Sequence, residues 1–569
     1  MRRRTCCWFD ARDARRPRIL RSLAMAGGVV AVFLASGCVA TGPLTWIENG
    51  FKVGPNYHRP PAPVAPEWIE AQDTRVQGHQ LPNGEWWNVF QDPILNSLIN
   101  TAYQQNLSLR VLGTRVLEAR AQQAIAVGNI FPQTQQATGQ YSRVNLSRNA
   151  PNNPTSLGPF LQTVTNRLGL PPSRGGFVNN FSDWLFGFNL SWELDFWGRF
   201  RRAIESANAT LDASVENYDD GLVTLLADVA TNYVQYRVAQ QRIRIARDNI
   251  RIQQGLVALV ERQQKVGTAT SLDVEQLRTL LEQTRSTVPA LQITLGQAND
   301  TLCILLGIPP RDLEPDLGPG PELGREPMPN TPNWAAAGIP ADLLRQRPDV
   351  RSAERQVAAQ SAQIGVAEAD LYPTFFLNGT LGWEAQDLSK LFEGNSFFGT
   401  IMPQFKWNIL NYGRIVNNVR VQDARTLELI ASYQNRVLTA AREVQTALRG
   451  FLRSQEQAED LARSARAAVA ATKIQEKLSS DIKNDAAAVN RLFTLENTQV
   501  QEQDNLAVAQ GNIALNLINV YRALGGGWEI RWQDGHWCQV RITGVAPVEA
   551  PPGADAQQLP QPRPVPQPR

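Results

Sequence analysis

The sequence predicts a mixed α and β fold in which one plan, a pair of extended segments followed by a very long helix, occurs twice. Three observations predict it. Residues 200–288 and 404–546 contain no proline, although the chain has 36, and proline is strongly unfavourable inside helices. Apolar residues in both ranges recur in steps of three and four, and the two sets coincide after a shift of 215 positions. The segments before both ranges alternate with the two-residue period of a strand.

The first 37 residues are predicted to be a secretory signal peptide. Residues 1–22 are rich in arginine and residues 23–37 form a run of apolar and small residues, as the two regions of a signal do. The leader holds eight Arg and two Asp, while the whole chain has a net charge of +3. The mature chain is therefore slightly acidic, and nucleic acid is not an expected partner. After this run no apolar stretch approaches the ~18–20 residues of a spanning helix.

The leader ends in Leu34-Ala35-Ser36-Gly37-Cys38, which resembles the cleavage box of bacterial lipoproteins. The resemblance implies a covalent lipid on Cys38, and Val39 in place of aspartate implies sorting to the outer membrane. The alternative is an ordinary exported protein in which this cysteine is incidental. The other mature cysteines, Cys303 and Cys538, have no metal-ligand spacing. Cys303 lies in an apolar run, which favours a small buried side chain.

The first copy is expected to begin with a helix over about 94–129 and to continue with extended segments at about 134–145 and 184–196. A loop rich in proline, glycine and asparagine joins the two segments. The apolar positions of the second segment are Phe186, Phe188, Leu190, Trp192 and Leu194. One wholly apolar face is what a lipid-facing strand requires. An ordinary half-buried strand of a soluble sheet gives the same pattern.

A very long helix follows from about Arg201 to Lys265, which would measure ~95 Å at 1.5 Å per residue. Its apolar seam consists of Val215, Tyr218, Leu222, Leu225, Val229, Tyr233 and Tyr236. Such a seam must be covered by a neighbouring helix. The chain is expected to turn at 265–273, where Gly267 can adopt the left-handed conformation and Thr270 or Ser271 can cap the returning helix.

The second copy repeats the plan with a helix over about 341–370, extended segments at about 373–384 and 398–409, and a long helix that turns near 478–485. The residues of its seam are Ile430, Tyr433, Val437, Ala440, Val444, Leu448 and Phe451. Four strands cannot close a membrane barrel, and lipid excludes an open sheet edge because its backbone groups stay unpaired. Either the strands form a soluble sheet, or several chains share one barrel.

The chain is thus expected to comprise six consecutive segments. They are a signal peptide (1–37), a lipidated N-terminal segment (38–85), a first repeat (86–310), a linker (311–340), a second repeat (341–530) and a C-terminal segment with a tail rich in proline and glutamine (531–569).

Four blocks of the sequence resemble the outer membrane efflux lipoproteins of the TolC family, of the OprM/NodT type. They are Val53-Gly54-Pro55-Asn56-Tyr57-His58-Arg59-Pro60, Trp86-Trp87 with Phe90 to Leu95, Leu343 to Glu354, and Tyr521 to Trp528. The resemblance implies a homotrimer with four strands per protomer in one 12-stranded outer membrane barrel. A periplasmic α-helical coiled-coil barrel is expected to continue it. No cofactor is implied apart from the lipid.

The function that this resemblance implies is a passive exit duct in a tripartite efflux system. Small molecules would pass from an inner membrane pump of the resistance-nodulation-division class, by way of a periplasmic adaptor, across periplasm and outer membrane. The alternatives are an enzyme and a structural coiled-coil scaffold. The sequence lacks the HExxH, GxSxG and Walker A motifs, and a scaffold has no use for aromatic strands. The sequence does not name the substrate.

The helix turns are expected at the periplasmic tip, where the resemblance implies a ring of aspartates near the start of the last long helix. Counting back from the glycines that end the returning helices, Asp273 in the first copy corresponds to Arg491, next to Asn490, in the second. We expect Arg491 to pair with Asp481 or Asp485 and to hold the tip closed. The alternative is a solvated tip, where an exposed pair contributes only ~0–1 kcal/mol.

Overall fold

The computed structural model describes residues 41–78, 84–145, 180–318, 328–342, 346–481 and 486–531, without the side chains of 479–481 and 486–489. The chain divides into two compact units. Unit 1 comprises residues up to 66, 118–217 and 340–442, and unit 2 comprises 67–117, 218–339 and the residues from 443 onward. Within the described ranges, no helix combines the length and the apolar character needed to cross a bilayer.

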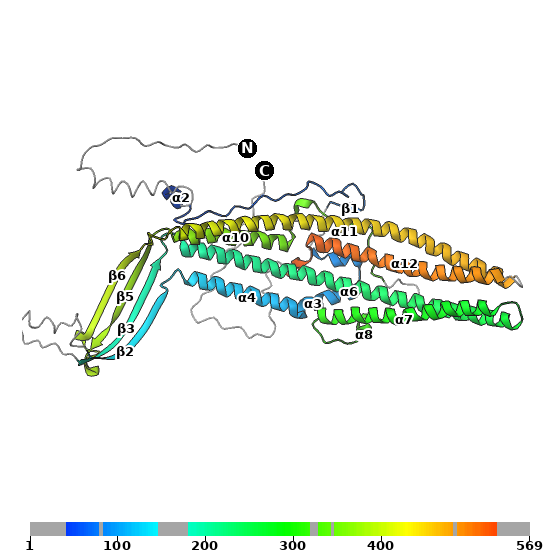
Figure 1. Cartoon of the computed structure of the whole chain (residues 1–569), viewed down its shortest axis with the longest axis horizontal. Coiled ribbons are helices and arrows are strands. Elements are labelled where there is room, and N and C mark those ends of the chain that lie inside the picture. The colour runs from blue at the N-terminus through cyan, green and yellow to red at the C-terminus, as the bar shows by residue number, and fades with distance from the viewer. Residues whose placement is uncertain are drawn as a thin grey trace, which may run out of the picture. The chain divides into compact units, whose positions relative to one another are not determined.

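Unit 1 contains a four-stranded antiparallel sheet (Figure 1). Its strands are β2 (Thr134–Asn145), β3 (Asn180–Leu194), β5 (Thr374–Ala385) and β6 (Phe397–Lys406), in the order β2-β3-β5-β6. The four predicted extended segments are confirmed, with ends that shift by up to four residues. The predicted long loop between β2 and β3 lies outside the described residues.

A long helix follows each pair of strands, as predicted. Helix α6 (Arg199–Lys265) follows β3 and helix α11 (Arg414–Asp481) follows β6. The returning helices are α7 (Ser271–Leu305) and α12 (Ala486–Leu524). All the seam residues are buried except the first of each set, Val215 and Ile430, which are half-buried. The apolar seams are therefore covered, as their spacing predicts.

A pair of equivalent hydrogen bonds, one in each copy, agrees with the internal duplication. The indole N–H of Trp192 donates to the carbonyl oxygen of Ile130, and that of Trp407 donates to the carbonyl oxygen of Leu371, each at 3.0 Å. Each of these tryptophans lies where a strand leads into a long helix. The glycine just before each long helix has a positive φ, 79° at Gly198 and 78° at Gly413.

The prediction of one continuous helix over 94–129 is wrong, because the chain breaks at Asn106 into α3 (Pro93–Gln105) and α4 (Leu107–Gly128). Asn106 has an extended ψ of 125°. Its side-chain oxygen accepts from the backbone N–H of Leu109 at 2.8 Å, and its amide donates to the carbonyl of Leu305 at 2.8 Å. The residue thus caps α4 and binds the end of α7 at the same time.

The helix expected from 341 begins instead at Pro348, as α10 (Pro348–Ala369). Proline suits the first helical position because its missing N–H has no partner there. It also disfavours helical geometry at the preceding Arg347, whose ψ is 116°.

The remaining short elements of the described residues are α2 (Pro43–Glu48), β1 (Val76–Gln77), η2 (Trp86–Phe90), α8 (Glu314–Leu317), β4 (Ala335–Ala336), η4 (Pro340–Asp342), η5 (Leu388–Lys390), η6 (Gly394–Ser396) and η7 (Trp528–Arg531).

Candidate functional site

The sheet of unit 1 has one apolar face, because residues directly opposite one another in antiparallel strands point to the same side. This face consists of Phe186, Phe188, Leu190, Trp192 and Leu194 from β3, Phe375, Leu377, Leu381 and Trp383 from β5, and Phe397, Ile401 and Phe405 from β6. Phe188 is 51%, Ile401 76% and Phe405 68% exposed. The described part of the chain therefore leaves this face open to a partner.

The opposite face of the same sheet is mostly polar, although Leu185, Phe376, Phe398 and Met402 also lie on it. Ser191 donates from its hydroxyl to the side-chain oxygen of Asn378 at 2.7 Å, and the amide of Asn189 donates to the hydroxyl of Thr138 at 3.2 Å. The contrast between the two faces matches a strand set that meets lipid on one side and a polar interior on the other.

The two outer strands of the sheet each leave one backbone edge without a partner in the described residues. Strand β2 pairs only with β3, and strand β6 pairs only with β5. Within a bilayer such edges must be paired, since lipid offers no hydrogen bonds. The sheet is therefore complete in a membrane only when the edges of β2 and β6 meet other strands.

The turn between α6 and α7 lies where the sequence predicts it, and it assigns Asp273 a local role. Gly267 has a φ of 81°. The carboxylate of Asp273 accepts from the backbone N–H of Thr270 at 2.8 Å and from its hydroxyl at 2.7 Å, while the Thr270 hydroxyl accepts from the Asp273 N–H at 3.2 Å. This reciprocal capping box leaves Asp273 only 3% exposed.

The turn between α11 and α12 is described only in part. Helix α11 ends at Asp481, while Asp485 and the Asp481 side chain lie outside the described atoms. Asn490 and Arg491 are exposed in the second turn of α12, and Arg491 has an interaction partner. Pairing of Arg491 with Asp481 or Asp485 stays a prediction.

Glu496, in the first third of α12, is a functional candidate that the sequence did not indicate. Its side chain is fully buried, and neither carboxylate oxygen has a hydrogen-bond partner among the described residues. Burial raises the pKa of this carboxyl to about 7, and the nearby Glu476 carboxylate adds to the rise. Along the sequence Glu496 looks like any other glutamate on a long amphipathic helix, so no local pattern identifies it.

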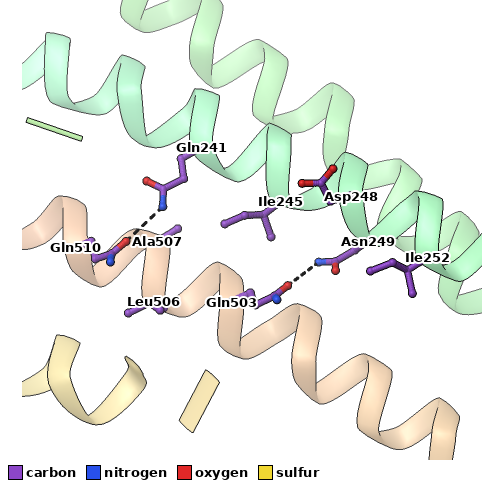
Figure 2. Close-up of a pocket in the computed structure, with 9 residues that line it drawn as sticks. All are labelled: Gln241, Ile245, Asp248, Asn249, Ile252, Gln503, Leu506, Ala507 and Gln510. Atoms are coloured by element: carbon purple, nitrogen blue, oxygen red, sulfur yellow. Dashed lines mark hydrogen bonds between the residues drawn. The ribbon is translucent and has the colours of Figure 1, made fainter. Parts of the chain in front are cut away.

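A shallow groove of about 220 Å³ lies between α6 and α12 in unit 2 (Figure 2). Two amide pairs bridge it, Gln241 with Gln510 at 3.3 Å and Asn249 with Gln503 at 3.1 Å. Ile245 and Leu506 also line it. Among the described residues no three His, Cys, Asp or Glu side chains are placed to hold a metal ion. The groove holds no nucleophile with an adjacent base.

The predicted lipidation residue, Cys38, lies outside the described residues, as does Cys538. Three residues after Cys38, Thr41 is held in place through its main chain and side chain. Its carbonyl accepts from the Tyr372 hydroxyl at 2.9 Å, its hydroxyl accepts from the Gly54 N–H at 2.9 Å, and its N–H donates to the Glu368 carboxylate. Cys303 is buried, as the apolar run around it predicts, and forms no disulfide within the described residues.

Comparison with known proteins gives one family match. The model of the family described as outer membrane efflux protein matches residues 98–308 and 339–526, which is more than half of the chain.

Two curated relatives and one solved structure illustrate the likeness. The pyoverdine export outer membrane protein OpmQ of Pseudomonas putida is 29% identical over 473 residues, which are 82% of this chain and 93% of that protein. The cation efflux system protein CusC of Escherichia coli is 27% identical over 492 residues, 84% of this chain and 96% of that protein. The structure of the outer-membrane channel OprN is 29% identical, with a TM-score of 0.73, and the match covers 84% of this chain and 99% of that one.

Proposed function

The chain belongs to the outer membrane efflux protein family, and from this premise we propose that it is the passive exit duct of a tripartite efflux system. Three copies form a homotrimer in the outer membrane, with a long helical extension in the periplasm. The partners are a periplasmic adaptor and an inner membrane pump of the resistance-nodulation-division class. The names of OpmQ and CusC refer to pyoverdine and to cations, so we propose a conduit and name no substrate.

The observation that carries the proposal is the amphipathic four-stranded sheet with two open edges. Three such sheets, joined edge to edge, close a 12-stranded barrel and pair every backbone group, as a bilayer requires. The alternating strand directions allow β6 of one protomer to run antiparallel to β2 of the next. The apolar face then meets lipid and the polar face lines the pore. The repeats over 86–310 and 341–530 each supply two of the four strands.

Two neighbouring residues of β5 test this arrangement. Leu381 is on the apolar face and Thr380 is on the polar face. We expect Leu381→Arg to destabilise the inserted trimer by ~2–4 kcal/mol, and Thr380→Arg to have little effect because arginine is solvated in a pore. The measurement is the fraction of folded trimer across a urea titration in lipid vesicles. Equal losses for both variants would contradict the assignment of the faces.

We propose no catalytic role and no cofactor for this chain. The relatives are efflux channels, and passive transfer through a duct requires positioned walls rather than a nucleophile or a bound metal. Substrate conversion by the purified trimer, in the absence of pump and adaptor, would overturn this part of the proposal.

Lipidation at Cys38 is supported by the place of Thr41. Three residues span at most about 10 Å, so a lipid on Cys38 would lie close to the anchored Thr41, near the ends of β3 and β5 that the long helices adjoin. Several acyl chains together anchor a protein stably. Mass spectrometry of the mature N-terminus is expected to find an acylated Cys38. We expect Cys38→Ala to weaken sorting more than conductance; an unmodified N-terminus at another residue would contradict lipidation.

The tip that carries Asn490 and Arg491 is proposed as the periplasmic gate, with Asp481 or Asp485 as the partner of Arg491. Asp273 supports the gate only by holding its own turn in shape, since its carboxylate is occupied by the capping box.

Charge reversal tests the gate. In Arg491→Glu, three like carboxylates around the aperture repel one another, and we expect higher single-channel conductance with a shift toward cation preference. Arg466→Glu, on the exposed side of α11, is the matched control. Unchanged conductance and ion preference in Arg491→Glu would remove this residue from the gate.

A further inference from the structure

Helix α2 and the turn that follows it, residues 43–51, present apolar side chains to the outside although their backbone is firmly held. Leu44 is 75%, Ile47 54% and Phe51 51% exposed. The Phe51 N–H donates to the Trp46 carbonyl at 2.8 Å. The guanidinium of Arg201 donates to the carbonyls of Gly50 and Phe51, each at 2.9 Å. The exposure of these three side chains is thus built into an ordered segment.

The backbone conformation of Phe51 is also unusual. Its φ is 62°, in the left-handed region that residues other than glycine, asparagine and aspartate rarely adopt. Strain of this kind persists where the surrounding structure imposes it and frequently marks function. The bonds from Arg201 impose it here.

Ring contacts join α2 to the apolar face of the sheet. Trp46 contacts Phe51 at 4.9 Å between centroids and stacks on Phe196 at 5.3 Å. Phe196 in turn contacts Phe375 at 5.3 Å, and Phe375 contacts Phe405 at 6.4 Å. Phe375 and Phe405 belong to the apolar face of the sheet. A continuous series of ring contacts therefore joins Trp46 and Phe51 to the apolar face of the sheet.

The cations nearest to α2 are already paired. Lys52 is bonded to Glu205, and Arg201 is bonded to Asp195 at 2.8 Å. The exposed side chains of residues 43–51 also include Thr45 and the carboxylate of Glu48. With Lys52 and Arg201 paired and a carboxylate present, this apolar surface fits an apolar partner better than an anionic one. Aromatic and apolar residues with this placement are typical of the boundary between head groups and acyl chains.

We infer that residues 43–51 are an interfacial membrane anchor that inserts Leu44, Ile47 and Phe51 into the periplasmic leaflet of the outer membrane. This inference rests on the proposed function, which places the apolar face of the sheet in lipid and the strand ends next to the long helices at the periplasmic surface. The anchor acts through apolar contact, so it does not require the lipid on Cys38 and does not depend on anionic head groups.

Spin labelling of the full-length chain tests the inference in vesicles of neutral phosphatidylcholine. Labels are attached to Ile47→Cys, to Ile401→Cys on the apolar face of β6 as the lipid reference, and to Ile69→Cys, which is 74% exposed, as the aqueous control. Cys38 is replaced by alanine in all three, so that no acyl chain can hold α2 at the bilayer. Collision rates with oxygen report lipid, and those with a water-soluble nickel chelate report water.

The expected ratio of oxygen to nickel accessibility at Ile47→Cys is several-fold above that at Ile69→Cys and close to that at Ile401→Cys. A ratio equal to that at Ile69→Cys would overturn the anchor, because α2 would then face water. Low accessibility to both reagents would also overturn it, since a neighbouring protomer would then cover α2. High nickel accessibility at Ile401→Cys would instead refute the placement of the sheet in lipid, and with it the proposed function.

Discussion

The two helical hairpins, α6–α7 and α11–α12, share one plan, but the side chains buried near their turns differ in kind. Near its turn the first hairpin encloses an apolar cluster of Val257, Val260, Val274, Leu277 and Leu281. The corresponding stretch of the second hairpin buries Leu492 together with polar side chains, namely Thr472, Gln475, Glu496 and Gln499. Burial of apolar area stabilises a helix pair, whereas a buried carboxyl without a partner costs free energy.

The two hairpins therefore keep the same architecture, but the different side chains buried near their turns should give them different local stabilities. The first turn is also fixed by Gly267 and by the capping box of Thr270 with Asp273. Segments with fewer buried apolar contacts open more readily, and moving elements are drawn from them. We therefore expect the second hairpin to open more readily than the first.

The largest effect is expected from Leu277→Ala, at the centre of the apolar cluster, where Leu277 is 1% exposed. Loss of the side chain leaves a cavity and should lower the stability of the first hairpin by ~2–5 kcal/mol. Amide hydrogen exchange along α6 and α7 measures it. The control is Leu272→Ala, since Leu272 is 65% exposed and its loss should change stability by less than ~0.5 kcal/mol. Equal exchange in the two variants would mean that the cluster does not stabilise the hairpin.

The next effect is a pH dependence that originates at Glu496. Its pKa rises from the ordinary 4.5 to about 7 on folding, so the folded state holds the proton more tightly than the unfolded state. The protonated Glu496 therefore contributes to the free energy of unfolding in full below about pH 4.5, and this contribution is lost as the pH rises through about 7. The total loss is on the order of 3 kcal/mol.

Glu496→Met removes the ionisable group while it keeps a similar volume. We expect the variant to melt at a higher temperature than the parent at about pH 8, to differ less at about pH 5, and to show a flatter pH profile. Glu459→Met, at an exposed position of α11, should leave the profile unchanged. A pH profile of Glu496→Met identical to that of the parent would contradict the assignment.

The smallest effect concerns the cap of α7. Thr270→Ala removes the hydroxyl of the capping box and should cost ~1 kcal/mol, while Thr270→Ser should restore most of it. Hydrogen exchange at the first amides of α7 is the measurement. The exchange of α12 should not change, and a loss spread equally over both hairpins would show that their stabilities are not separate.

Periodic features of the sequence predicted most of the fold. The long helices, the strands and the buried seam from Tyr218 to Tyr236 follow from proline placement and from spacing, which act along one segment. The break at Asn106 was missed because the apolar spacing continues through it, although the residue caps α4 locally, and because its contact with Leu305 is far away in the sequence. The two-residue strands β1 and β4 are too short for any pattern.

The positions of the helix turns could be predicted from the sequence, but the roles of the side chains at the turns could not. The turn at 265–273 was found from Gly267, but the capping role of Asp273 depends on the side-chain geometry of Thr270. Glu496 gave no signal, because its burial results from packing of α12 against other helices.

Cysteine cross-linking across the edges of β2 and β6 tests whether neighbouring chains complete one barrel through these strands. Pairs such as Thr138→Cys with Thr400→Cys, and their neighbours along both strands to cover the register, are oxidised in the membrane and resolved without reductant. For the pairs that are in register we expect a ladder of covalent dimers and trimers. Monomers alone for every pair, together with a monomer mass by light scattering, would contradict it.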